Sequence, residues 1–223
     1  MNNISKDDAP SLYNSALWAD ADSEAFYSYN GGNLGTTSYK VQGDPPPNSF
    51  WRFTPSGASG SWSEVVADTS PNFSTLTRSV DGYYASGGGL GFALGGYVGA
   101  ATEAGLPRDF DGYEIPGMVI YNTTSSQWYN VTSPGSNDVA AYGAAHYVPI
   151  FGPAGILMTF GGFQGDSAAS FDWVLLYEPI SQTWHYQRAT GDLPPKADAP
   201  CVVGIEGDDD TYEACQGPCP IDL

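Results

Sequence analysis

The feature that most constrains the fold of this chain is a pattern of glycine and aromatic residues that occurs three times. In each copy an apolar or aromatic run ends in a glycine pair, and a second run, a polar turn and a tryptophan follow. The clearest copy, from Gly155 to Trp184, predicts three short antiparallel strands, with a chain reversal at the glycine pair where a Cβ would obstruct it. One copy would also fit an ordinary meander, but three ordered copies indicate a structural repeat.

The three copies share the glycine pair and the tryptophan, and two of them share a tyrosine seven residues before the tryptophan. We predict that the repeat is built by Gly31, Gly32 and Trp62, by Gly95, Gly96, Tyr121 and Trp128, and by Gly161, Gly162, Tyr177 and Trp184. The tyrosines and tryptophans lie on neighbouring strands and can fill the space between adjacent sheets. We therefore expect Trp128 and Trp184 to be largely buried.

A glycine pair, then a tyrosine, then a tryptophan, once per four-stranded blade, resembles the kelch-repeat family. The phrases Val80–Gly89 and Asp198–Ile205 look similar to kelch-repeat proteins of filamentous fungi. The resemblance implies an all-β, kelch-type β-propeller, related to the galactose-oxidase-like central-domain superfamily. Because the glycine pairs lie 64 residues (31 to 95) and 66 residues (95 to 161) apart, and a kelch repeat has roughly 50, we expect long inserted loops.

The spacing of the repeats predicts a single partial propeller over residues 1–223. We expect blades at about 13–66, 82–131 and 145–187, and an incomplete blade over 199–223. About three and a half four-stranded blades cannot close a ring of four to eight. The chain is therefore expected to be a fragment of a larger propeller, with exposed sheet edges at both ends.

The charge of the chain limits its partners. Lys and Arg number 7 against 25 Asp and Glu, so the net charge at pH 7 is −18. A negative surface repels nucleic acid and anionic lipid, whereas neutral or cationic partners remain open. The apolar runs are also too short for a membrane span in this chain.

Cysteines and glycosylation sequons bear on the cellular compartment. Cys201, Cys215 and Cys219 all lie near the C-terminus, so no disulfide framework spans the fold. Asn-x-Ser/Thr sequons occur at Asn3 and at the candidate glycosylation sites Asn72, Asn122 and Asn130. The sequons favour a secreted or membrane-anchored parent protein, as in many members of the similar family, although the N-terminal residues do not form a signal peptide.

No catalytic residue, metal ligand or cofactor site is predicted. The kelch fold also resembles that of galactose-oxidase-type copper radical enzymes, in which two His and two Tyr bind copper. The only histidines here are His146, expected on an inner strand, and His185, which follows Trp184 on an outer strand. An oxidase whose copper ligands lie in missing blades remains the alternative hypothesis.

Two long inserts are the best candidates for a binding function. Residues 33–48 and 97–116 connect the second and third strands of their blades and should emerge on the same face as the links between blades. The second insert carries Glu103, Arg108, Asp109, Asp111 and Glu114. Loops of this length either cover blade edges or bind a ligand. We therefore predict a non-catalytic protein-interaction or ligand-binding module, whose partner is an unknown protein or a neutral or cationic ligand at this long-loop face.

Overall fold

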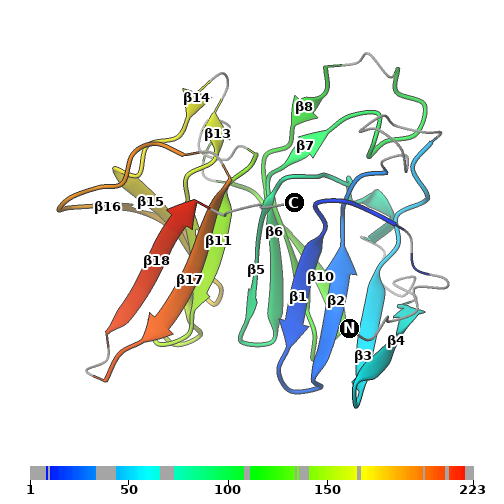
Figure 1. Cartoon of the computed structure of the whole chain (residues 1–223), viewed down its shortest axis with the longest axis horizontal. Helices are drawn as coiled ribbons and strands as arrows, with labels where there is room; N and C mark the ends of the chain where they lie inside the picture. Colours follow the sequence, from blue (N-terminus) through cyan, green and yellow to red (C-terminus); the bar gives the residue numbers. More distant parts are fainter. Residues whose placement is uncertain are drawn as a thin grey trace.

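The computed structural model of the chain is all-β, as the composition and repeats predicted (Figure 1). The structure describes residue 9 and residues 11–33, 44–65, 73–107, 111–133, 135, 141–164, 167–197, 199–208 and 211–218. Within these ranges, the one helical element is a single 3-10 turn, η2 (Phe73–Thr75). No helix in the described residues is long and apolar enough to cross a membrane.

In the described residues the strands form three antiparallel four-stranded sheets and three two-stranded sheets, and the two-stranded sheet nearest the C-terminus is called the fourth sheet here. The first sheet contains β1 (Ala16–Asp20), β2 (Ala25–Tyr29), β3 (Trp51–Ser56) and β4 (Ser59–Glu64). The second contains β5 (Tyr83–Gly87), β6 (Leu90–Leu94), β9 (Met118–Asn122) and β10 (Gln127–Val131). The third contains β11 (Ala144–Val148), β12 (Ile156–Phe160), β15 (Trp173–Glu178) and β16 (Thr183–Arg188). The fourth contains β17 (Pro200–Glu206) and β18 (Tyr212–Pro218).

The first strands of successive sheets pack side by side, β1 on β5, β5 on β11 and β11 on β17. Each sheet then runs outward from this common line of inner strands (Figure 1). The second and third sheets thus each present one face to the sheet before and the other face to the sheet after. This is the arrangement of kelch-like propeller blades, and the described sheets do not close a ring.

Aromatic side chains fill the interface between the first and second sheets. Trp18 on β1 is fully buried; its Nε1 donates to the carbonyl of Phe92, and its ring lies against the backbone of Gly91. The centroid of Phe50 lies 4.6 Å from that of Tyr121 and 4.8 Å from that of Trp128. The prediction that Trp128 is buried is confirmed, since only 4% of it is exposed.

The interface between the second and third sheets is mainly aliphatic. It contains Phe92, Leu94, Met118 and Ile120 from the second sheet and Leu157, Leu175 and Tyr177 from the third. Trp184 packs on Tyr177 at a centroid distance of 4.7 Å and donates from Nε1 to the carbonyl of Thr132. It is partly buried, and less completely than Trp128.

A left-handed turn ends the second strand of each four-stranded sheet. It is formed by Gly95 and Gly96 in the second sheet, by Gly161 and Gly162 in the third, and by Asn30 and Gly31 in the first. The following residue then bridges the strand leading into the sheet, as Gly32 does with Tyr13 and Tyr97 does with Val80. The predicted first pair, Gly31 and Gly32, is therefore wrong by one residue. Asparagine tolerates a positive φ better than most residues, which hides this turn in the sequence.

The fourth sheet is a two-stranded hairpin within the predicted incomplete blade 199–223, and its second strand, β18, continues to Pro218. Pro218 faces Pro200 at the end of the ladder, where a missing backbone N–H is tolerated. Cys201 on β17 is disulfide-bonded. The remaining cysteines of the chain are Cys215 and Cys219, so this bond stays within the C-terminal segment.

Candidate functional site

The inserts between second and third strands gather at one end of the sheets, here called the loop face. The small hairpins β7 (Tyr97–Val98) with β8 (Tyr113–Glu114), and β13 (Phe163–Gln164) with β14 (Ser167–Ala168), lie together at the top of Figure 1. The backbone N–H of Asn33 donates to the carbonyl of Ala101, which joins the insert of the first sheet to that of the second. Of the residues predicted to matter here, Arg108 and Asp109 lie outside the described residues.

A cavity of about 420 Å³ opens between three segments of the loop face that are distant in sequence. Its walls are Pro45–Asn48 from the first insert, Leu76–Arg78 from the link between the first and second sheets, and Thr102–Ala104 with Tyr113 from the second insert. The Asn48 side chain ties two of these walls together by donating from Nδ2 to the carbonyl of Leu76 at 2.6 Å. The two predicted inserts and a blade-to-blade link therefore form one concave surface.

Arg78 in the cavity wall is 4% exposed. Its Nε donates to Oδ1 of Asn48 at 3.1 Å and its Nη2 donates to the carbonyl of Pro47 at 2.6 Å, while Nη1 has no hydrogen-bond partner. Burial lowers the pKa of the guanidinium. The two hydrogen bonds of Arg78 hold the segment Pro47–Asn48 in place. They leave Nη1 buried without an acceptor, which is unfavourable for a charged donor.

The rim of the cavity combines an aromatic ring with a carboxylate. Tyr113 is 45% exposed, and its hydroxyl donates to Oε2 of Glu103 at 3.3 Å. Partial burial, and then the nearby Glu103, raise the pKa of Tyr113. Asp111 and Glu114 are exposed on the same insert. At the cavity itself, the ring of Tyr113 offers an apolar contact beside the negative charge of Glu103, which suits neutral or cationic groups.

A second polar cluster lies where the chain enters the inner strands. Asn14, Asp81, Tyr142 and Ala199 each precede the first strand of a sheet and each have a positive φ. Backbone bonds from Tyr142 N–H to the Asp81 carbonyl and from Ala199 N–H to the Tyr142 carbonyl connect successive sheets. The Asp81 carboxylate accepts hydrogen bonds from the side chains of Asn14 and Tyr142.

This inner cluster was missed in the sequence, although its residues could have been found. Asp81 lies in the family-like phrase Val80–Gly89, and Asn14 takes the corresponding place before β1. Burial raises the pKa of the Asp81 carboxyl, because removing water disfavours the charged form. A partly accessible carboxyl with a shifted pKa is a candidate contact for a ligand.

The two histidines lie on the first and last strands of the third sheet. His146 on β11 is half-buried, and its Nε2 is 2.6 Å from the hydroxyl of Tyr212 on β18. Burial lowers the pKa of His146. His185 is exposed on β16. The described part of the chain holds no group of three or more His, Cys, Asp or Glu side chains placed to bind a metal ion.

Two of the candidate glycosylation sites can be placed. Asn122 ends β9, and its Oδ1 accepts hydrogen bonds from the backbone N–H groups of Thr124 and Ser125. Asn130 is exposed on the outer strand β10. Asn72, like Asn3, lies outside the described residues. Glycosylation of Asn72, Asn122 and Asn130 stays a prediction.

Comparison with known proteins agrees with the repeat pattern at the level of the family resemblance. No family model matches the chain. The chain is 25% identical to a kelch repeat-containing protein of Arthroderma benhamiae, over 90% of this chain and 34% of that relative. It therefore spans about a third of the length of the curated relative it matches. Together with the four-stranded blades, this similarity supports a kelch-like repeat protein.

Proposed function

We propose that the chain is a non-catalytic interaction module that binds a protein segment, or another neutral or cationic ligand, at its loop face. The cavity walled by both inserts and the link between the first two sheets carries this proposal. Loops of this length that build a common concave surface, instead of lying along sheet edges, favour binding over simple coverage. The similarity to a kelch repeat-containing protein also suggests protein interaction.

The charge at the rim indicates which ligands fit. Glu103, Asp111 and Glu114 accompany the exposed ring of Tyr113, and the whole chain carries −18. A cationic or neutral peptide with an aromatic or proline residue would stack on Tyr113 and Pro45–Pro47 while its charge met the carboxylates. Such binding should weaken as salt is added, because the rim charges are exposed and screened.

The experiment is a selection of peptides from a displayed random library on the intact chain, followed by affinity measurements on defined variants. Tyr113→Ala should weaken the selected peptides by roughly tenfold or more, since exposed aromatic anchors at interfaces contribute above about 1.4 kcal/mol. Tyr129→Ala is the matched control, because Tyr129 is similarly exposed, 39% against 45%, but lies on the outer strand β10.

A charge variant separates the rim from the aromatic contact. Glu103→Gln should lower the affinity for cationic peptides, reduce the salt dependence of binding and leave the fold unchanged, because Glu103 is exposed. If the selected peptides bind Tyr113→Ala as well as the parent chain but lose affinity for Tyr129→Ala, the binding surface is not the loop face and the proposal is wrong.

A further inference from the structure

Three tyrosines lie near Asp81, the carboxylate of the inner cluster. The Tyr142 side chain donates a hydrogen bond to Asp81. Tyr97 lies beside the preceding residue, Val80, through backbone hydrogen bonds of 3.0 and 2.8 Å. Burial, then Asp81 and then the hydroxyls of Tyr13 and Tyr97, raise the pKa of Tyr142 to about 12. We call Tyr13, Asp81, Tyr97 and Tyr142 the inner tyrosine site.

Backbone contacts between three sheets hold this site together. Tyr13 precedes β1, Asp81 precedes β5 and Tyr142 precedes β11. The backbone N–H of Tyr142 donates to the carbonyl of Asp81. The N–H of Gly31, in the turn that pairs with Tyr13, donates to the carbonyl of Ser79 at 3.0 Å. The side chains are therefore brought together by the fold itself, which lowers the entropic cost of binding a ligand between them.

The Asp81 carboxylate is paired with neutral groups. Its hydrogen-bonding side chains are the amide of Asn14 and the hydroxyl of Tyr142. Burial raises the pKa of Asp81, because removing water disfavours the charged carboxylate. A cation placed beside Asp81 would replace part of the lost stabilisation, and it would be attracted more strongly here than in open water.

Two further carboxylates lie beside Tyr97. Glu114 on β8 is its cross-strand partner, and the Tyr97 hydroxyl lies against Gly112, the residue that follows Asp111. Partial burial, and then Asp111 and Glu114, raise the pKa of Tyr97. Both carboxylates are exposed. Negative charge thus lies at Asp81 and again beyond Tyr97, and the resulting potential favours a cation at this end of the inner strands.

The acceptor oxygens of the site suit a cation that carries N–H donors. A carboxylate can accept more hydrogen bonds than the two that Asn14 and Tyr142 donate to Asp81, and a phenol oxygen that donates its proton can still accept. A primary ammonium group has three donors to fill these places, whereas a quaternary ammonium has none. Ca²⁺ and Mg²⁺ favour several carboxylate oxygens, and the only carboxylate within the inner tyrosine site is that of Asp81.

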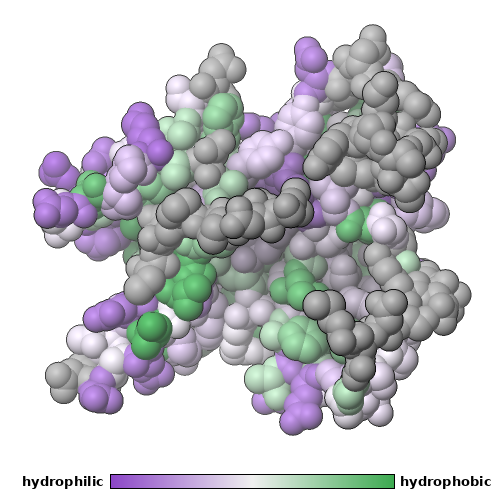
Figure 2. All heavy atoms as spheres, in the orientation of Figure 1, coloured by the Kyte–Doolittle hydropathy of each residue, from purple (hydrophilic) through white to green (hydrophobic). Residues whose placement is uncertain are grey.

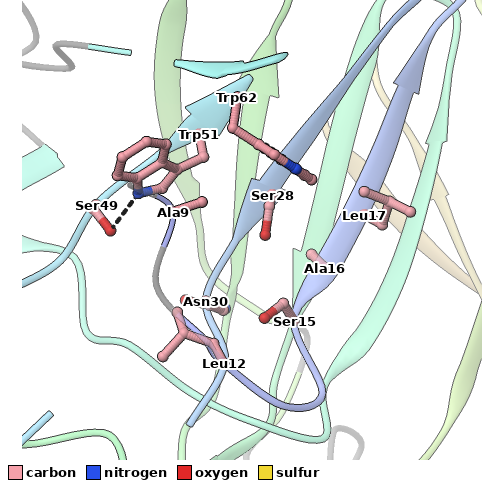
Figure 3. Close-up of a pocket in the computed structure, with 10 residues that line it drawn as sticks. All are labelled: Ala9, Leu12, Ser15, Ala16, Leu17, Ser28, Asn30, Ser49, Trp51 and Trp62. Atoms are coloured by element: carbon pink, nitrogen blue, oxygen red, sulfur yellow. Dashed lines mark hydrogen bonds between the residues drawn. The ribbon is translucent and has the colours of Figure 1, made fainter. Parts of the chain in front are cut away.

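The apolar parts of the surface offer a cation no such partner. The pocket of about 170 Å³ in Figure 3 is lined by Leu17, Trp51 and Trp62 together with other uncharged residues. Figure 2 shows hydrophobic residues over the places of β1 and β17 in Figure 1. A cation in such surroundings would lose hydration without gaining a carboxylate.

We propose that the inner tyrosine site binds a primary ammonium group, whose N–H donors point to the Asp81 carboxylate and to the hydroxyls of Tyr13 and Tyr142. Tyr97 and the carboxylates beside it add an aromatic surface and negative potential. The ammonium group belongs either to a lysine side chain of a partner or to a free alkylamine. None of the four residues lines the loop-face cavity, so this inference does not depend on the proposed function.

Titration of the full chain with n-butylammonium, followed by NMR chemical shifts at low salt, tests the proposal. We expect saturable binding with a dissociation constant of about 1 mM or lower. Asp81→Asn should raise this constant at least about tenfold, because it removes the charge that the ammonium group contacts. Tyr142→Phe should raise it at least about threefold, because it removes one acceptor and keeps the ring.

Matched control variants carry the same chemical changes elsewhere. Asp20→Asn removes one negative charge at the opposite end of β1, from a carboxylate that also accepts hydrogen bonds. Tyr129→Phe removes an exposed hydroxyl that donates to Gln127 on the outer strand β10. Both should bind n-butylammonium as the parent chain does. Circular dichroism on each variant establishes that the sheets remain folded.

Related ligands test the chemistry and identify its source. Tetramethylammonium, which has the charge but no N–H donor, and 1-butanol, which has the chain but no charge, should bind at least about tenfold more weakly. Nα-acetyl-lysine methylamide distinguishes the two sources. If it binds as tightly as n-butylammonium, the site accepts a lysine of a partner; if it binds more weakly, the site accepts free alkylamines.

Several results would overturn the proposal. They are the absence of a saturable shift up to about 20 mM n-butylammonium, equal binding by Asp81→Asn and Asp20→Asn, and tetramethylammonium binding as tightly as n-butylammonium. If binding is lost in Glu103→Gln but retained in Asp81→Asn, the ammonium group binds at the loop-face cavity. That outcome contradicts this inference and leaves the proposed function intact.

Discussion

The interface between the first and second sheets and the interface between the second and third sheets share one backbone arrangement but differ in the side chains that fill them. Gly91 and Leu157 occupy the same place in the second and third sheets, each beside the tyrosine of the repeat, Tyr121 or Tyr177. At the first interface the glycine leaves room for the indole of Trp18, whereas at the second interface Leu157 itself is fully buried. The repeat thus fixes the positions at which side chains meet. Each interface reaches close packing with a different combination of large and small side chains at those positions.

This comparison explains why the two repeat tryptophans differ in burial. Trp128 is enclosed by Tyr29, Phe50 and Phe73, with ring centroids at 5.0, 4.8 and 5.1 Å. Trp184 has a ring contact with Tyr177 and a hydrogen bond to the Thr132 carbonyl. The same motif position therefore holds a core residue in one sheet and a boundary residue in the next.

The largest expected effect is the loss of Trp128. Trp128→Ala should lower the free energy of unfolding by about 3–5 kcal/mol, because the indole leaves a cavity among three aromatic rings. Trp184→Ala should cost less, about 1–2 kcal/mol, because part of that side chain is already in water. Urea unfolding of both variants checks this, and equal costs would contradict the distinction between the two interfaces.

A smaller loss of stability is expected when a side chain is enlarged at the interface between the first and second sheets, where no free space remains. Gly91→Ala should destabilise the fold by about 1–3 kcal/mol, since a methyl group there overlaps the Trp18 ring. Gly99→Ala is the control, because a Cβ at Gly99 makes only ordinary contacts with Tyr97 and its φ is not left-handed. It should stay within about 0.5 kcal/mol of the parent chain in the same urea titration. If Gly91→Ala left the free energy of unfolding unchanged, the interface between the first and second sheets would be less tightly packed than the structure shows.

The smallest effects concern buried tyrosine hydroxyls, which occur at both interfaces. The hydroxyls of Tyr29 and Tyr177 are buried without a hydrogen-bond partner, so Tyr29→Phe and Tyr177→Phe should be neutral or slightly stabilising. Tyr83→Phe should instead cost about 0.5–1.5 kcal/mol, because its hydroxyl donates to the Gly161 carbonyl at 2.9 Å. Thermal unfolding of the three variants shows whether the two classes separate, and a clear loss in either of the first two would reveal a partner that the structure lacks.

Much of the fold could be predicted from the sequence, because the residues that define the repeat are required for a particular backbone conformation or a particular packing position. Gly95, Gly96, Gly161 and Gly162 mark left-handed turns, and Tyr121 with Trp128 marks a hairpin. The first turn was misplaced because Asn30 adopts the conformation that glycine has in the other copies. The partners that bury Trp128 were not predicted either: Phe73 lies outside the repeated motif, and the run that contains Phe50 does not indicate which sheet that side chain faces.

The candidate site was predicted in outline and missed in detail. Insert length and strand order placed both long loops at one end, but the cavity depends on Arg78 and Leu76 in the link between sheets, which carry no sequence signal of their own. Hydrogen bonds from Arg78 to Asn48 and Pro47 join residues about thirty positions apart, and such pairings are set by tertiary structure. The Asp81 cluster likewise depends on the adjacency of inner strands.

The central claim is that successive sheets pack face to face with the inner strands adjacent, and a double-mutant cycle between Trp18 and Gly91 tests it most directly. If the Trp18 ring lies on Gly91, then Gly91→Ala should cost about 1–3 kcal/mol in the parent chain and almost nothing in Trp18→Ala, where the space is already empty. Urea unfolding of the four proteins measures the coupling. The predicted result is a coupling energy close to the cost of Gly91→Ala in the parent chain. Strictly additive effects would show that the first and second sheets do not meet at these residues and would contradict the central claim.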